Sequence, residues 1–238
     1  IGRAICLGLG AQGCKVGVFD INMDAARDVA EEICSASGEK NAAGQSGSQS
    51  SSQSAAFAVD ITNLHSVQAG VAAFENAFGP TAVLVNNAGW DRVTPFLKTA
   101  PDLWKKIIDI NLYGPIHMHY TVLPGMVERG SGAVINISSD AGRVGSSGEA
   151  VYSAAKGGII SFTKTLAREL ARSGVRLNTV CPGPTETPLF NEIAGDGETG
   201  AKIAQSLIRA IPMKRLAQPD DFPGIVAFLA SDDAQYIT

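Results

Sequence analysis

The chain alternates between short runs of apolar, often β-branched residues and longer segments whose apolar positions recur at helical spacing. Short runs of this kind, bounded by glycine or polar residues, are typical of buried strands in a parallel sheet. Five strands are predicted, at 15–21, 55–61, 82–89, 132–139 and 175–183. Helices are predicted at 1–13, from about Met23, up to Phe78, and at 102–129, 151–172 and 220–231. The alternation favours an α/β fold with a doubly wound parallel sheet.

Two stretches depart from this alternation. Residues 37–54 are rich in Ser, Gln and Gly, which is too polar a composition to order itself, so they predict a flexible surface insertion between a helix and an edge strand. Residues 189–214 contain three glycines close together and predict an irregular loop. The whole chain has 238 residues, of which 45% are apolar. This length and composition predict a single domain over 1–238 that includes the insertion.

Three polar residues stand where hydride-transfer chemistry would need them. Ser139 ends a predicted strand, and Tyr152 and Lys156 lie one turn apart on one face of the following helix. An ammonium near a phenol lowers the pKa of the phenol, so Lys156 would let Tyr152 exchange a proton with a substrate oxygen that Ser139 also hydrogen-bonds. A tyrosine and a lysine at this spacing can equally be an exposed surface pair. The neighbouring motifs decide between the two interpretations.

Composition excludes several other classes of function. A formal net charge of −4 without a basic run disfavours general nucleic-acid binding, and no apolar run approaches the ~18 residues of a membrane span. Cys6, Cys14, Cys34 and Cys181 lack metal-site or disulfide spacing, which favours reduced thiols and an intracellular, cytoplasmic protein. The three histidines also lack ligand spacing, so no metal is expected. An organellar targeting peptide, if there is one, would lie ahead of Ile1.

The spacing of Ser139, Tyr152 and Lys156 resembles the Ser…Tyr-x-x-x-Lys signature of the short-chain dehydrogenase/reductase family. The resemblance covers the chain except for the Ser/Gln-rich insertion, and it implies a Rossmann-type sheet with catalysis at the carboxyl ends of the strands. The family's first and last strands have no counterpart in residues 1–238. Ile1 and Gly2 match the end of the family's glycine-rich phosphate turn, so an amino-terminal segment is expected to precede them. Asn111, where proline and glycine interrupt the helical pattern, matches a family residue that supports a proton relay through water.

The resemblance also assigns a cofactor, NAD. Asp20 at the second family strand would accept hydrogen bonds from the adenosine ribose and repel a 2′-phosphate, and Ile21 offers no cation that would favour NADP. Taken alone, Asp20 and Asp60 could instead cap the helices that follow them. Asn86 would tie neighbouring strands together. The full set of implied cofactor residues is Gly2, Asp20, Ile21, Asp60, Ile61, Asn87, Ala88, Gly89, Tyr152, Lys156, Pro182, Gly183, Thr185 and Thr187.

The implied substrate class comes from three stretches, AGWDRVTPF, SSDAGRVGSSGEAVYS and CPGPTETP. They are similar to dehydrogenases of alicyclic 2-hydroxyacyl-CoA thioesters, such as 2-hydroxycyclohexanecarboxyl-CoA, and less closely to 3-oxoacyl-carrier-protein reductases. Trp90, Asp91, Asp140, Arg143 and Glu149 would border the substrate, with Arg143, Arg92 or Arg215 as a phosphate contact. A homodimer or homotetramer is expected, as in the family. The alternative from another class is a regulator that binds a dinucleotide without turnover.

Overall fold

The computed structural model describes residues 1–41, 53–195 and 197–238. Within these ranges there are five strands, β1 (Val16–Asp20), β2 (Ser54–Ala58), β3 (Val83–Asn86), β4 (Gly132–Ile137) and β5 (Val175–Val180). Each lies within a predicted strand or starts one residue before it. Of the predicted insertion, 37–41 continue a helix and Ser54 opens β2, while 42–52 lie outside the described residues.

All strand pairs are parallel, and they form two sheets. β1 pairs with β2, and β3, β4 and β5 pair in that order. The described residues include no strand between β1 and β3. A cavity of ≈ 1020 Å³ lies there, between the facing edges of the two sheets. We call this space the inter-sheet cavity.

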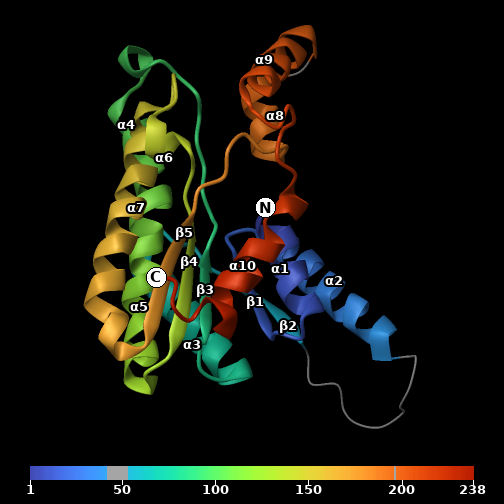
Figure 1. Ribbon diagram of the computed structural model, residues 1–238, viewed down its shortest axis with the longest axis vertical. Coiled ribbons are helices and arrows are strands. Elements are labelled where there is room, and N and C mark those ends of the chain that lie inside the picture. The colour runs from blue at the N-terminus through green and yellow to red at the C-terminus, as the bar shows by residue number, and fades with distance from the viewer. Residues whose placement is uncertain (42–52, 196) are drawn as a thin grey trace.

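Helices cover both faces of the sheets (Figure 1). On one face α3 (Leu64–Phe78), α5 (Gly114–Arg129) and α7 (Ala150–Leu170) pack over β3, β4 and β5. On the other face α1 (Gly2–Ala11) and α10 (Pro223–Ala230) pack over β4, and α2 (Met23–Asn41) packs over β1. No helix within the described ranges is both long enough and apolar enough to cross a membrane.

The two faces of β4 explain how its short sequence positions both layers. Ala133, Ile135 and Ile137 contact the cluster around Ile5 and Val226, whereas Val134 joins the cluster of α3, α5 and α7. This is the two-residue period of a strand that is buried on both sides. The parallel arrangement brings the carboxyl ends of β1, β3, β4 and β5 to one edge, where the polar motifs lie.

Buried amides stitch this region together beneath the carboxyl edge. Asn86 Nδ2 donates to Asn136 Oδ1 at 2.8 Å, which confirms the expected tie between neighbouring strands. Asn136 Nδ2 in turn donates to Thr163 Oγ1 at 2.9 Å and lies 3.2 Å from His119 Nε2. Burial lowers the pKa of His119, so the neutral ring fits this network as a packing residue.

The helical pattern predicted at 102–129 is interrupted as expected. α4 (Pro101–Ile108) is followed by a π-turn, Asp109–Tyr113, before α5 begins at Gly114. Pro115 occupies the first turn of α5, where its missing N–H costs no hydrogen bond. The interruption places Asn111 inside the π-turn, a feature frequent at functional sites.

The prediction of an irregular loop at 189–214 is wrong. This region forms α8 (Pro188–Ala194) and α9 (Gly197–Ala210), which project from the body above the strand ends (Figure 1). Thr187 caps α8 by accepting from Phe190 N at 3.1 Å, and Pro188 is pre-organised for the first helical position. We call α8 and α9 together the arm. The chain leaves for the arm and returns from it at one parallel bridge, Thr185↔Ala217.

Candidate active site

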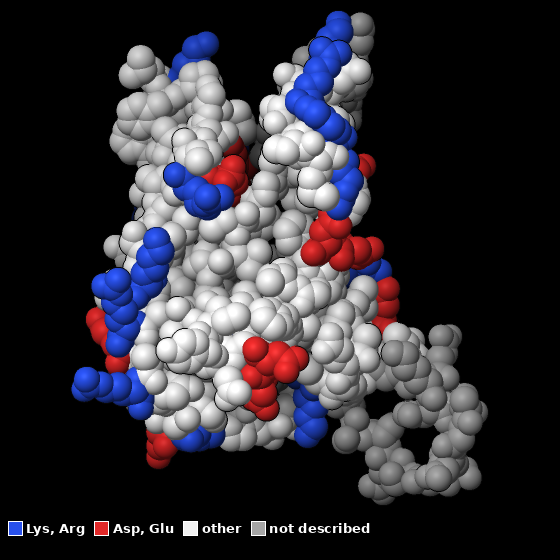
Figure 2. Space-filling model, viewed as in Figure 1, with Lys and Arg blue, Asp and Glu red and all other residues white. Residues whose placement is uncertain are grey.

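A cleft of ≈ 1310 Å³ opens at the carboxyl ends of the strands, between the arm and the α4–α7 side of the molecule. Figure 2 shows it as a hollow between the two upper parts of the surface. Most residues that the sequence nominated line it. The exceptions are Gly2, Arg92, Asn111, Arg143 and Arg215, none of which lines the cleft.

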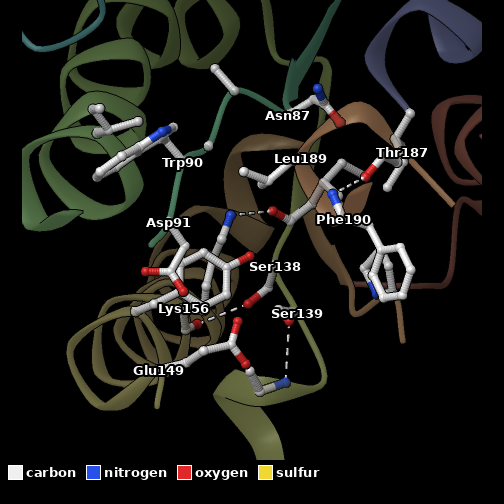
Figure 3. Close-up of a pocket in the computed structure, with 18 of the residues that line it drawn as sticks. Asn87, Trp90, Asp91, Ser138, Ser139, Glu149, Lys156, Thr187, Leu189 and Phe190 are labelled. Atoms are coloured by element: carbon white, nitrogen blue, oxygen red, sulfur yellow. Dashed lines mark hydrogen bonds between the residues drawn. The ribbon is translucent and has the colours of Figure 1, made fainter. Parts of the chain in front are cut away.

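Lys156 is buried at the base of the cleft, with 4% of its surface exposed. Its Nζ donates to Ile137 O at 3.1 Å, at the tip of β4, and Ser138 Oγ donates to Lys156 O at 2.9 Å (Figure 3). Burial lowers the pKa of Lys156 to about 8 because a charged ammonium loses its hydration there. The lysine therefore stays largely protonated at neutral pH and directs its charge into the cleft.

Tyr152 lies next to this ammonium, with Lys156 Nζ 5.6 Å from the centre of its ring. The pKa of Tyr152 is nevertheless raised to about 12, first by burial and then by the charges of Glu149 and Asp91, which outweigh a hydrogen bond with Ser139. The sequence predicted the opposite direction. That prediction counted the nearby cation but could not include desolvation or two carboxyls that arrive from other segments.

Ser139 sits at the turn from β4 into the short helix α6 (Ala141–Val144). Its Oγ accepts from Ala141 N at 3.2 Å and shares a hydrogen bond with the Tyr152 phenol. Glycine makes this approach possible, because a Cβ on Gly142 would lie 2.7 Å from backbone atoms of Lys156 and Gly157. The close packing of α6 on α7 thus brings Ser139, Tyr152 and Lys156 to one place.

Asn111 is fully buried behind the cleft wall and not exposed to it. Its Nδ2 donates to Trp90 O at 2.7 Å and to Ile107 O at 2.9 Å, and its Oδ1 accepts from Trp90 N at 3.3 Å. The π-turn frees the Ile107 carbonyl for this bond. Asn111 therefore holds the loop after β3, and through it the cleft wall, in place.

The far end of the cleft contains Asp20 and Asp60 at the ends of neighbouring strand segments. Asp20 Oδ1 accepts from Asn22 N at 2.8 Å, and Asp60 Oδ1 accepts from Thr62 N and Oγ1 at 2.9 and 2.7 Å. Neither aspartate caps a helix. Asn22 and Asn63 do so, by accepting from Ala25 N and from His65 N and Ser66 N.

The middle of the cleft fits a dinucleotide through its glycines and backbone. A Cβ on Gly89 would lie 2.9 Å from Asn111 Oδ1 and 3.3 Å from Lys156 Nζ, and one on Gly2 would lie 2.5 Å from Asn87 Nδ2. Glycine at these two positions lets Asn87, Asn111 and Lys156 pack closely around the backbone that forms this part of the wall. Thr185 Oγ1 donates to Gly183 O at 2.9 Å, so this hydroxyl shapes the wall locally.

The candidate substrate residues divide into two groups. Trp90, Asp91, Asp140 and Glu149 line the cleft. Arg143 is exposed outside it and pairs with Asp140, Nη1 to Oδ1 at 3.2 Å. Arg215 is held by a bidentate pair with Asp221, at 2.6 and 3.0 Å, and Arg92 is also exposed.

Several cleft residues escaped the sequence reasoning. Leu189, Phe190 and Leu207 face the cleft from the arm, which the sequence assigned to a loop. Lys106 lies 3.7 Å above the Trp90 ring and covers the indole with its cation. Ser138 adjoins the motif serine in the chain, and that adjacency was the one available signal. Among the described residues there is no cluster of His, Cys, Asp or Glu that could hold a metal.

Comparison with known proteins agrees with this geometry. A family model described as enoyl-(acyl carrier protein) reductase matches residues 1–238. Acetoacetyl-CoA reductase from Shinella zoogloeoides is 38% identical over 100% of this chain and 89% of its own length.

Solved structures show the same fold with different cofactors. NAD⁺-bound xylitol dehydrogenase has a TM-score of 0.85 at 27% identity, covering 99% of this chain and 90% of its own. A variant of actinorhodin polyketide ketoreductase with NADPH has a TM-score of 0.87 at 30% identity, covering 99% and 88%. The family match over the whole chain, the shared fold and the cleft motifs lead to one conclusion: this chain belongs to the short-chain dehydrogenase/reductase family of oxidoreductases, which act on hydroxyl and keto groups.

Proposed function

We propose that this chain uses NAD to interconvert a β-hydroxyacyl thioester and its β-keto form, with alicyclic 2-hydroxyacyl-CoA thioesters such as 2-hydroxycyclohexanecarboxyl-CoA as substrates. The observation that carries the proposal is the placement of Tyr152 between Ser139 and Lys156 at the carboxyl end of β4. The acyl-thioester class is supported by the relative that acts on acetoacetyl-CoA.

NAD would lie along the cleft, with its adenosine ribose against Asp20 and its second ribose against Tyr152 and Lys156. When bound, it supplies or accepts the hydride. Tyr152 Oη exchanges a proton with the substrate oxygen, and the Ser139 hydroxyl hydrogen-bonds that oxygen and fixes its position. Lys156 contributes positive charge at the base of the cleft. Asn111 holds the cleft wall in position by its hydrogen bond to Trp90 O.

NAD is preferred over NADP because of the charge at the end of β1. Asp20 is exposed to the cleft, and a carboxylate there repels a 2′-phosphate. Ile21 beside it has 74% of its surface exposed and offers no cation. Replacing Asp20 by Ser should therefore raise the ratio of NADPH to NADH turnover.

The charge on the arm supports a CoA ester. Figure 2 shows blue Lys and Arg side chains on the part of the molecule that carries α9, beside the cleft mouth. Arg209, in the last turn of α9, belongs to this group, and such cations favour the phosphates of CoA. A β-ketoacyl group on acyl carrier protein is the second candidate, favoured by the description of the matching family model.

The test is NADH consumption with a panel of β-keto thioesters that includes acetoacetyl-CoA, the cyclic 2-oxo CoA ester and an acyl-carrier-protein ester. Tyr152→Phe should lower turnover at least about 10²-fold because it removes the exchanging proton. Tyr236→Phe, at a tyrosine that is fully exposed, is the matched control. NADH binding without turnover across the panel would overturn the proposed function in favour of a dinucleotide-sensing role.

We also propose that the chain forms a homodimer or homotetramer through α5 and α7. Tyr113 at the π-turn and Tyr120 and Val127 on α5 recur every seven residues, and 51%, 67% and 37% of their surfaces are exposed. Residues at this spacing form one stripe along a helix, so they offer an apolar strip to a second copy. The mass of the protein in solution tests this proposal.

A further inference from the structure

The carboxyls of Asp91 and Glu149 enter the cleft from segments far apart in the sequence (Figure 3), and Tyr152 lines the same cleft. Asp91 belongs to the loop after β3, and Glu149 is the residue before α7. A backbone hydrogen bond from Thr94 N to Gly148 O, at 2.8 Å, ties the two segments together. A Cβ on Gly148 would lie 2.8 Å from Val93, so this approach also depends on a glycine, with φ of +83°. Their proximity is built into the fold.

Asp91 is an unusual carboxyl because it is 3% exposed and, within the described part of the chain, no donor lies at hydrogen-bonding geometry to either of its oxygens. The backbone N–H of Arg92 favours the ionised form, but burial outweighs it and raises the pKa of Asp91 to about 7. Glu149 is the side chain that interacts with the Asp91 carboxyl, and this interaction raises the pKa of Asp91 further. Two ionised carboxylates cannot hydrogen-bond each other, because both only accept. A hydrogen bond between them requires one proton.

We propose that Asp91 and Glu149 share one proton in the free protein, and that the remaining negative charge keeps the Tyr152 phenol protonated and ready to donate a proton to a ketone. Asp91 and Glu149 are then positioning residues that act through Tyr152. The preference for proton donation rests on the proposed function, in which Tyr152 exchanges the proton with substrate.

Tyr152 meets few other charges that could produce this effect. Lys156 faces it from α7, and its positive charge acts in the opposite direction. Asp140 and Arg143 on α6 offset each other as a pair, and so do Lys105 and Asp109 on the α4 side. Lys106 covers Trp90, and Asp102 is exposed on the rim. Glu149 and Asp91 are the acidic groups that raise the pKa of Tyr152, in agreement with the proposal.

The shared proton can be observed without substrate. In protein carrying ¹³C-carboxyl aspartate and glutamate, one carboxyl should titrate near pH 7, and that titration should vanish in Asp91→Asn. In Glu149→Gln the Asp91 carboxyl should titrate at lower pH, because the like charge is gone. Titration of every aspartate near its ordinary value in the wild-type protein would overturn the proposal.

The effect on Tyr152 is read from the pH profile of alcohol oxidation at saturating NAD and substrate. Oxidation needs the phenolate, so Glu149→Gln and Asp91→Asn should move the rising limb of kcat to lower pH by about one unit. Asp102→Asn removes one negative charge from the cleft rim and should leave the limb in place. A merely structural role would lower the rate at every pH without moving the limb, and that result would refute the proposal.

The two arms separate the possible failures. If no thioester is turned over, the proposed function fails, while the carboxyl titration still decides whether the proton is shared. Glu149 is half-buried, so Glu149→Gln is an independent variant in which both measurements can be made.

Discussion

Burial moves the pKa values of Lys156 and Tyr152 in opposite directions, to about 8 and about 12. As pH rises, the lysine of the free protein therefore loses its proton before the tyrosine does. In the free protein, a charged Lys156 and an ionised Tyr152 are therefore not present together at any pH in appreciable amount. The folded pKa of Lys156 lies below its ordinary 10.5, so the folded state binds fewer protons than the unfolded state between about pH 8 and 10.5, and stability rises with pH across that window.

Asp91 has the opposite linkage, because its folded pKa of about 7 lies above the ordinary 3.8. The folded state binds more protons than the unfolded state between these values, so stability falls as pH rises from about 4 to about 7 and the full penalty applies above that. Asp91→Asn should raise the free energy of unfolding by about 2 kcal/mol at pH 8, and this gain should shrink toward pH 4.

Urea denaturation at several pH values measures this gain. Asp102→Asn is the control, since it makes the same substitution at an exposed aspartate. An Asp91→Asn gain that is equal at pH 5 and pH 8 would contradict the linkage.

Sequence alone could nominate individual residues because motif spacing survives without coordinates. Ser139, Tyr152 and Lys156 are brought together as the spacing predicted. The contact between Asp91 and Glu149 could not be predicted, because it depends on two loops that meet only in the folded chain. The direction of the Tyr152 pKa depends on the same contact and was missed for the same reason.

At the level of elements, the π-turn in front of α5 is maintained by one side chain. Asn111→Ala should destabilise the protein by about 2–3 kcal/mol, because the Trp90 and Ile107 carbonyls would lose their donor inside the protein. It should also reduce turnover, since the loop that carries Asp91 would no longer be held. Asn191→Ala, at an exposed helical asparagine, should change stability by less than about 0.5 kcal/mol. Equal unfolding midpoints for the two variants would exclude this role of Asn111.

The packing of α6 on α7 depends on a missing side chain. Gly142→Ala would place a methyl 2.7 Å from backbone atoms of α7, so we expect a loss of about 1–3 kcal/mol and a displaced Ser139. Gly224→Ala in α10 meets nothing within 4 Å and should stabilise by about 0.5–1 kcal/mol. Thermal unfolding compares the two substitutions. A Gly142→Ala protein as stable as the wild type would show that α6 is free to shift.

Among the elements, strands were easier to predict than the arm. Buried parallel strands appear as short apolar runs with polar ends, and all five were found. α8 and α9 were missed because glycines at 195, 197 and 200 resemble loop composition, whereas Thr187 and Pro188 form a helix start that a glycine count overlooks.

For the whole molecule, the division into two sheets predicts unequal local stability. β1 and β2 form a two-stranded sheet whose own cluster contains Val16, Val18, Ala26, Ala30 and Ile33, while β3, β4 and β5 share the two larger clusters. Two-stranded sheets are marginal without further packing, and this one rests on the smallest of the three clusters.

We therefore expect the amides of β1 and β2 to exchange with deuterium faster than those of β4. Hydrogen exchange followed by mass spectrometry measures this difference peptide by peptide. Equal protection of β1 and β4 would mean that the two sheets open as one cooperative unit.

The parallel bridge between Thr185 and Ala217 makes the arm an insertion whose two ends meet at one place on the scaffold. Ala217 N donates to Pro184 O at 3.0 Å, and Glu186 N donates to Ala217 O at 2.9 Å. These two hydrogen bonds hold the ends of the arm together. A graft between these two points could vary in length or composition without re-threading any strand. Substitutions in the arm can therefore change which substrates enter the cleft without disturbing the scaffold that holds Tyr152.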